Sequence, residues 1–297
     1  MTTAPGSTAE ARDLAARQAA ATGPDACVLV RVHHRMDDLV VCLQVIRKHW
    51  LRGSYAVVVV SNGVSRGHPV PAAARQLADA VLEIDANPGH FGGNAQLLRE
   101  GLTAVPARCR WTILLEADTW IFGDAILRAY MHRLQRDQRV WASALWVEKF
   151  YSLALDVAIV DTAFARAHPA LFAFAEPPGP EAWVHEQLRR AQQVPLYIRE
   201  HMPVHVPALM RRFHNESGGR FRTFVRARMV THHVEDLSRG LLEKKRIANQ
   251  VLGQREFDVP WADDLRRRQR WLRLGESLRP LVPRSTWFRR RRWKTLS

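Results

Sequence analysis

The stretch that decides the fold reads Trp111-Thr-Ile-Leu-Leu-Glu-Ala-Asp-Thr-Trp-Ile-Phe122, an apolar strand that ends in the carboxylates of Glu116 and Asp118. Side chains at positions i and i+2 of an extended strand point to the same side, so one strand end can present both carboxylates to a cation. Carboxylate oxygens suit Mg²⁺ or Mn²⁺, which keep further positions for phosphate oxygens. An acid-x-acid sequence after a strand is also a common turn. The order of elements around the stretch favours the metal site.

Strands and helices alternate along the chain before this stretch. The predicted strands are 27–32, 56–60, 80–84 and 112–115, and the predicted helices are 39–50, 72–80 and 94–105. Asp37 or Asp38 is expected to cap the first helix. Strands that are continuously apolar and separated by helices indicate a parallel sheet with helices on both faces. Ligands of such sheets bind beyond the carboxyl ends of the strands, which here are followed by the loops 31–34, 61–63, 87–94 and 116–118.

A glycine-rich loop, Gly89-His-Phe-Gly-Gly93, precedes the predicted helix that begins at Asn94. Backbone N–H groups at a helix N-terminus favour an anionic group, so the loop is predicted to bind phosphate. The alternative is a tight strand-to-helix turn. The loop does not have the G-x-G-x-x-G spacing of a dinucleotide fingerprint. The pair His33-His34 after the first strand is predicted to line the nucleotide pocket rather than to bind metal.

The composition is that of a globular chain with a sizeable core. Its 297 residues are 47% hydrophobic. No run of about 18 apolar residues occurs, which predicts no membrane-spanning helix. The first 24 residues lack the hydrophobic segment of a signal peptide. Cys27, Cys42 and Cys109 have no metal-ligand spacing and are expected to be reduced and buried. Together these features predict a cytoplasmic protein.

Positive charge is concentrated near the C-terminus. Of the net charge of +15, residues 265–297 contribute +11, from eleven arginines and one lysine against Glu276, which leaves +4 for the remainder. Trp271, Trp287, Phe288 and Trp293 lie among the arginines, a pattern suited to anionic lipid headgroups or nucleic-acid phosphates. We predict peripheral contact of this basic tail with the inner membrane face, and we do not expect nucleic acid as a partner. The alternative is a solvated helix and a disordered end.

At this point a family resemblance becomes specific. The strands and helices that end in Leu115-Glu-Ala-Asp118 resemble the nucleotide-binding half of the GT-A glycosyltransferases, particularly family 2. The segment Asn87-Pro-Gly-His-Phe-Gly-Gly-Asn-Ala-Gln96 is similar to that family's Asn-x-Gly…Ala-x-Asn segment. Asn62-Gly63 stands where family members often carry an Asp-Gly pair, so an amide replaces a carboxylate. The resemblance covers roughly residues 27–235.

The resemblance implies a set of donor and metal residues. Asp118 and Glu116 would bind Mn²⁺ or Mg²⁺, and one of His232 and His233 would complete the metal site, unless both are ordinary surface or core histidines. The residues expected to bind the donor are Arg31, His33, Asn62, Asn87, Gly89, Gly93, Asn94, Glu116 and Ala117.

A second acidic segment, Pro180-Glu-Ala-Trp-Val-His-Glu-Gln-Leu-Arg-Arg-Ala191, followed by Val194-Pro-Leu-Tyr-Ile198, looks like the family's acidic helix start and following strand. On that match Glu181 falls where the family places its catalytic base. Glu181 could instead be a first-turn carboxylate that favours the helix dipole. Glu186 is the other candidate base, on a different helix face, where it can pair with Arg189 or Arg190.

The function implied by the resemblance is metal-dependent transfer of a hexosyl or related group. The donor would be a nucleotide diphosphate sugar of the UDP, GDP or dTDP type, and the sugar would move to an acceptor hydroxyl with inversion. A nucleotidyltransferase acting on a sugar phosphate is an alternative, but it should carry a glycine-rich basic loop after the first strand, where Val32-His-His-Arg-Met-Asp37 has no glycine. The other alternative is a non-catalytic protein that binds an anionic surface through its tail.

The predicted organisation has three parts. An N-terminal lead-in covers residues 1–24, and a GT-A catalytic domain covers 25–240, with its nucleotide-sugar half at 25–122 and its acceptor half at 123–240. A helical, basic C-terminal extension covers 241–297. Acceptor recognition is predicted in residues 145–174 and 213–228, which are the least patterned parts of the catalytic domain.

Overall fold

The computed structural model describes residues 24–145, 153–174, 179–198, 222–224, 227–231 and 237–259, together with residues 270, 274 and 277. A seven-stranded sheet forms the centre, with the strand order β3-β2-β1-β4-β7-β6-β8. Its strands are β1 (Ala26–Val32), β2 (Tyr55–Ser61), β3 (Ala80–Glu83), β4 (Trp111–Glu116), β6 (Trp141–Leu145), β7 (Leu153–Asp161) and β8 (Leu196–Tyr197). β7 runs antiparallel to β4 and β6, whereas the other neighbouring pairs are parallel.

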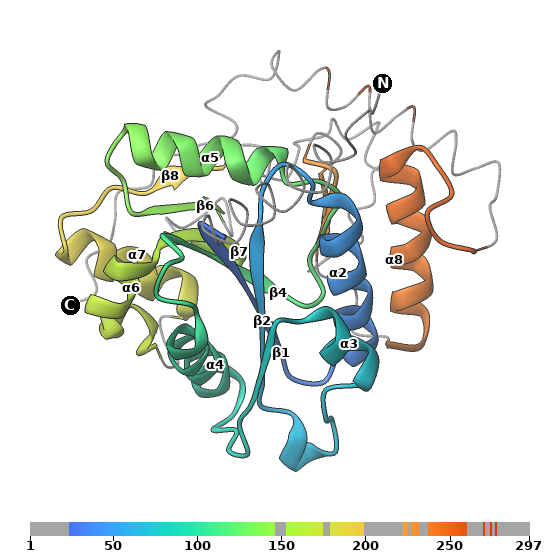
Figure 1. Cartoon of the computed structure of the whole chain (residues 1–297), viewed down its shortest axis with the longest axis horizontal. Coiled ribbons are helices and arrows are strands. Elements are labelled where there is room, and N and C mark those ends of the chain that lie inside the picture. The colour runs from blue at the N-terminus through green and yellow to red at the C-terminus, as the bar shows by residue number, and fades with distance from the viewer. Residues whose placement is uncertain are drawn as a thin grey trace, which may run out of the picture.

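Helices cover both faces of this sheet (Figure 1). One face packs against α2 (Met36–His49), α3 (Ala72–Leu77), α5 (Ala125–Arg136) and α8 (Leu237–Leu252). The other face packs against α4 (His90–Ala104), α6 (Thr162–Ala167), α7 (Pro180–Arg190) and the 3-10 turn η2 (Pro169–Phe172). A short turn η1 (Val64–Arg66) follows β2, and a second sheet joins β5 (Trp120–Ile121), β10 (Met229–Thr231) and β9 (Arg222–Phe224) in that order.

The burial of the central strands explains this layered arrangement. In β1, Val28 and Val30 face the core under α2, whereas Cys27 and Leu29 face the core under α4. Each fully buried Val or Leu contributes about 1.5–3 kcal/mol relative to exposure, so a strand that is apolar on both sides is most stable between two layers of helices. The predicted mostly parallel, Rossmann-like sheet with helices on both faces is confirmed.

The predicted elements differ from the observed ones at a few ends. α4 begins at His90 rather than at Asn94, so Gly92 and Gly93 belong to its first turns. α2 begins at Met36 with Arg35 at its N-cap and no side-chain cap, so the prediction that Asp37 or Asp38 caps this helix is wrong. Asp38 instead forms a buried ion pair with Lys244.

Other predictions concern cysteines and membrane segments. Cys27, Cys42 and Cys109 are free and buried, as predicted. Within the described part of the chain, no helix combines the length and apolarity needed to cross a membrane. The N-terminal lead-in up to residue 23 and nearly all of the basic tail lie outside the described residues.

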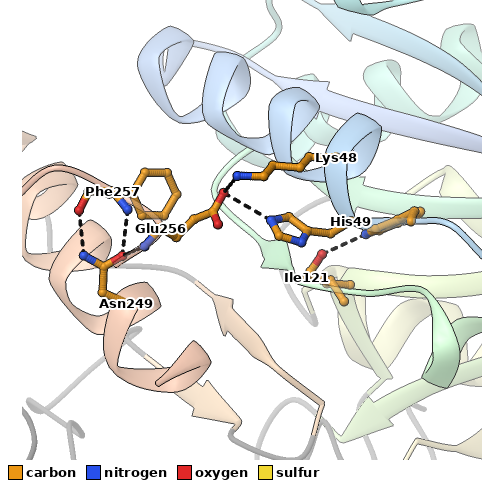
Figure 2. A network of polar contacts seen from close by, with 7 residues as sticks. Lys48, His49, Ile121, Asn249, Glu256 and Phe257 are labelled. Atoms are coloured by element: carbon orange, nitrogen blue, oxygen red, sulfur yellow. Dashed lines mark hydrogen bonds and ion pairs between the residues drawn. The ribbon is translucent and has the colours of Figure 1, made fainter. Parts of the chain in front are cut away.

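The segment after residue 240 is partly built into the core. α8 crosses the predicted domain boundary at residue 240, and its Ile247, Ala248 and Val251 pack among the core residues beneath α2. The chain then turns back toward α2, where Glu256 accepts hydrogen bonds from Lys48 at 2.8 Å and from His49 at 3.2 Å (Figure 2). At least the first part of the predicted extension therefore belongs structurally to the central fold.

Candidate functional site

The acid pair that ends β4 lies in a turn rather than on a continuous strand. β4 ends at Glu116, and the backbone N–H of Thr119 donates to the carbonyl of Glu116 at 2.9 Å, which closes a turn. The N–H of Ala117 donates to the carbonyl of Arg31 at 3.0 Å. Asp118 sits within this turn and not on the strand. The prediction that one extended strand presents both carboxylates is therefore wrong. The two carboxylates have different cationic partners.

Glu116 is bound to Arg31, whose guanidinium is buried at the end of β1. Arg31 and Glu116 are register partners on adjacent strands, and their side chains meet at 3.1 Å. Arg31 also donates to Asn94 Oδ1 at 2.7 Å and to the carbonyl of Leu155. Only 3% of Arg31 is exposed, so removing its anionic partner would leave a buried charge unpaired, which is strongly destabilising. Three residues predicted to bind the donor thus bind one another.

Two more carboxylates lie around Arg31. Glu181 stands in the first turn of α7, after Gly179 with φ of 90°, and Asp156 is buried in β7. Burial raises the pKa of Glu181, and the negative charges of Glu116 and Asp156 raise this pKa further, against the opposing effect of Arg31. We call Arg31, Glu116, Asp156 and Glu181 the acidic cluster. A carboxylate with a raised pKa beside other carboxylates has the properties of a proton acceptor in catalysis.

Glu186, the other candidate base, is turned to a different set of partners. Its carboxylate accepts two hydrogen bonds from Arg189, each at 2.7 Å, and one from Arg190 at 3.0 Å. The predicted pairing with these arginines is confirmed. The hydrogen bonds from both arginines lower the pKa of Glu186 to about 2. The pKa shifts of the two candidate bases therefore have opposite directions, because Glu186 is held by two arginines and Glu181 lies partly buried beside other carboxylates.

The glycine-rich segment is joined to two asparagines. Asn87 Oδ1 accepts from the N–H of Gly89 at 3.0 Å, and Asn87 Nδ2 lies 3.0 Å from His33 Nδ1. Asn62 Nδ2 donates to the carbonyl of Gly93 at 3.1 Å. A Cβ at Gly93 would lie 2.6 Å from Asn87 Oδ1, so only glycine fits there without a shift. We call His33, Asn62, Asn87 and Gly93 the amide cluster.

A group of three imidazoles adjoins the amide cluster. The ring of His33 lies 5.4 Å from that of His34 and 6.0 Å from that of His68, measured between centroids. Burial lowers the pKa of His34, and the charge of Arg35 lowers this pKa further. Sequence reasoning did not find His68, which follows η1 without any motif, or Asp156. For Asp156 a signal exists, since a charged residue within the apolar run 153–160 is rarely buried without a reason.

Asp118 belongs to a separate network of buried charges. Its carboxylate lies 3.4 Å from Arg35 Nε, and Arg35 is in turn 3.9 Å from the carboxylate of Asp38. Asp38 accepts from Lys244 Nζ at 2.7 Å, and Lys244 also donates to the main-chain carbonyl of Asp118. The Lys244 ammonium lies 4.1 Å from the centroid of the Trp120 ring. Nothing in the local sequence indicates this contact between α8 and the turn after β4.

Glu116 and Asp118, the predicted metal ligands, are each paired with an arginine in this structure. His232 and His233, the predicted third ligands, lie outside the described residues. Among the residues that the structure does describe, no group of three or more His, Cys, Asp or Glu could hold a metal ion. Mg²⁺ and Mn²⁺ commonly need only one or two protein carboxylates together with phosphate and water oxygens. The carboxylates of Glu116 and Asp118 supply that kind of oxygen ligand, and 24% of the Glu116 side chain is exposed.

Comparison with known proteins finds no matching protein-family model and no curated protein with a similar sequence. Among solved structures, a mannosyltransferase from Pyrobaculum calidifontis in complex with GDP-Man and Mn²⁺ is 13% identical, covers 88% of this chain and 71% of its own, and has a TM-score of 0.47. A 4-diphosphocytidyl-2C-methyl-D-erythritol synthase from Anaerococcus prevotii DSM 20548 is 8% identical, covers 59% of this chain and 86% of its own, and has a TM-score of 0.42. At these values neither similarity assigns a function.

Proposed function

We propose that this protein is a glycosyltransferase that moves a sugar from a nucleoside diphosphate sugar to an acceptor hydroxyl. The observation that carries the proposal is the acidic cluster at the carboxyl edge of a mostly parallel sheet, where ligands of such sheets bind. The amide cluster lies along the same edge, after β1, β2 and β3. One cluster supplies ionisable groups, which are suited to proton transfer, and the other supplies fixed hydrogen-bonding groups, which are suited to donor recognition.

Glu181 is proposed as the general base. An acceptor hydroxyl becomes a sufficient nucleophile when a carboxylate removes its proton as the bond to the anomeric carbon forms. The raised pKa of Glu181 makes it a better proton acceptor than an ordinary glutamate. Arg31 offsets part of the negative charge in the cluster, so that Glu116 and Asp156 can stay close to the base. Displacement in line with the departing diphosphate would invert the anomeric carbon, as the family resemblance implies.

Glu116 and Asp118 are proposed to hold Mn²⁺ or Mg²⁺ together with the phosphate oxygens of the donor. When bound, such an ion offsets the negative charge that grows on a departing diphosphate. His33, Asn62 and Asn87 are proposed to bind the nucleoside part. Asn62 is 1% exposed, and its buried Oδ1 has no hydrogen-bond partner among the described residues.

A thermal-shift panel tests the proposal. UDP, GDP and dTDP sugars, each with and without Mn²⁺, should raise the melting temperature for at least one nucleotide, because a ligand that binds only the native state stabilises it. The same nucleotide sugar should be slowly hydrolysed by the protein. Release of pyrophosphate from a nucleoside triphosphate and a sugar phosphate, without hydrolysis or transfer from any nucleotide sugar, would instead establish the nucleotidyltransferase alternative.

A further inference from the structure

The helix α8 lies far from the turn after β4 in sequence and beside it in space. Figure 1 shows α8 next to α2, on the side of the sheet opposite α4 and α7. Lys244, in the middle of α8, is completely buried. A buried lysine is stable only when its ammonium is paired and hydrogen-bonded, so the partners of Lys244 show what this part of α8 holds in place.

The ammonium of Lys244 joins three elements at one point. It donates to Asp38 in α2 and to the main-chain carbonyl of Asp118, and it lies over the ring of Trp120 in β5. The contact with Asp118 is to the backbone, whereas the carboxylate of Asp118 is paired with Arg35. Lys244 therefore holds the main chain of the turn, while Arg35 pairs with the carboxylate of Asp118.

The chain after α8 holds the same region from a second direction. Asn249 Oδ1 accepts from the N–H groups of Glu256 and Phe257, each at 2.7 Å, and Asn249 Nδ2 donates to the carbonyl of Phe257 at 2.8 Å (Figure 2). This arrangement places the Phe257 ring 5.7 Å from the ring of Trp120 and 6.3 Å from that of Phe122, between centroids. Lys244 therefore contacts the turn and Trp120 of β5, and Phe257 contacts Trp120 and Phe122 from a second direction.

We propose that Lys244 is a positioning residue for the donor site, which holds the main chain of the turn that carries Asp118 so that residues 237–259 complete the site. The proposal rests on the proposed function, since it assigns Asp118 to the donor and its metal. Substitution of a residue that contacts a metal ligand, rather than the metal itself, typically lowers metal affinity about ten- to hundredfold.

A simpler role for Lys244 would be to neutralise Asp38. Removal of Lys244 alone does not separate the two roles, because Lys244→Met would leave the Asp38 carboxylate buried beside Arg35 only, and the fold would lose stability. The double substitution Lys244→Met with Asp38→Asn removes both charges of the pair. Under the simpler role this variant regains normal behaviour, whereas under the proposal the Asp118 carbonyl still lacks its donor.

Two measurements on the full-length chain decide between these roles. The first is amide hydrogen exchange of residues 117–122, where Thr119 N–H is bound to Glu116 and Phe122 N–H to Arg228. The second is calorimetric titration with UDP, GDP and dTDP, each in the presence of Mn²⁺. Thermal unfolding of every variant is recorded alongside. Lys245→Met is the matched control, since it removes a charge from the same helix at a side chain that lies 5.9 Å from the Phe257 ring.

The expected result is a double variant with near-normal melting temperature, about tenfold faster exchange in residues 117–122 and about tenfold weaker nucleotide binding. Asp38→Asn alone should melt at a lower temperature, because the buried ammonium of Lys244 loses its carboxylate partner. Below that temperature it keeps Lys244 on the Asp118 carbonyl and should bind the nucleotide nearly as well as the unaltered chain, so this variant also decides the matter if the double variant does not fold. Recovery of both exchange and affinity in the double variant, or a loss in Asp38→Asn as large as in Lys244→Met, would overturn the proposal. Absence of nucleotide binding by the unaltered chain would overturn the proposed function, whereas unchanged exchange refutes only the role of Lys244.

Discussion

The acidic cluster and the amide cluster lie along the same edge of the sheet but are built differently. In the acidic cluster, burial and neighbouring charges shift the pKa of Glu181, and the buried Arg31 binds Glu116 and Asn94. In the amide cluster, asparagine side chains fix the backbone of Gly89 and Gly93 through uncharged hydrogen bonds. Groups that exchange protons are suited to a chemical step, whereas groups of fixed polarity are suited to recognition. The comparison therefore predicts that Glu181 of the acidic cluster affects turnover, whereas the amide cluster affects donor affinity.

The largest effect is expected from the base. Glu181→Gln should lower turnover about 10²-fold or more, because an amide cannot take the acceptor proton, and it should leave donor affinity nearly unchanged. Steady-state kinetics with the identified donor and acceptor, and calorimetry of donor binding, check the two parts. Near-normal turnover in this variant would remove Glu181 from the proposed role.

The second effect separates the two carboxylates of the turn. Asp118→Ala should weaken Mn²⁺-dependent donor binding by more than about tenfold. Even the loss of a residue that only contacts a metal ligand lowers metal affinity about ten- to hundredfold. Glu116→Gln, which keeps an oxygen acceptor for Arg31, should weaken the same binding less. Donor titrations with and without Mn²⁺ measure the difference. Undiminished, metal-dependent affinity in Asp118→Ala contradicts the assignment of the metal.

The amide cluster should respond in affinity. Asn87→Ala removes a side chain that binds both Gly89 and His33, and donor binding should weaken about tenfold, the scale of one lost hydrogen bond in a buried setting. Turnover at saturating donor should stay close to normal. Gln193→Ala, which removes an amide that donates to the nearby carbonyl of Ala191, is the control. A large fall in turnover without a change in donor affinity would show that the amide cluster takes part in the chemical step.

The pH dependence of turnover sharpens the same comparison. Because the pKa of Glu181 is raised above its ordinary value of 4.5, its carboxylate becomes protonated at a higher pH than that of an ordinary glutamate. Turnover should therefore fall as the pH is lowered, with a midpoint above 4.5, while the residual activity of Glu181→Gln should lack this step. If the turnover of the unaltered chain falls with a midpoint at or below pH 4.5, Glu181 is not the base.

The smallest effect is expected at Glu186, five residues further along α7. Its pKa is lowered to about 2, so its ion pairs stabilise the fold above pH 4.5, and this stabilisation is lost as the pH falls toward 2. Glu186→Gln should lower the free energy of unfolding at pH 7 by only about 1 kcal/mol, because both arginines are largely exposed to solvent. Urea unfolding at several pH values checks this. Turnover should be unchanged, which makes the variant a control for Glu181→Gln.

The order and type of the elements were predictable from sequence because they depend on local patterns. The continuous apolar runs of β1, β2 and β4 are incompatible with a half-exposed sheet, and the helices between them require parallel connections. The loops after β1, β2 and β3 could therefore be assigned to one edge before any contact was known. The starting residue of α4 was less predictable, because Gly92 and Gly93 favour a loop locally, whereas in the fold the N–H of Gly93 donates to the carbonyl of Gly89 and Asn62 donates to the carbonyl of Gly93.

Sequence by itself determined the sheet, the edge at which its ligands should bind, and the acidic residues that follow the strands at this edge. Only the tertiary structure decided how those residues are paired: Glu116 with Arg31, Asp118 with Arg35, and Glu186 away from the acidic cluster. It also brought Lys244 to the turn after β4, across 126 residues. Apolar periodicity depends on nearest neighbours along the chain, whereas a buried charge is stable only beside its partner, and that partner can come from any element that the completed fold brings close.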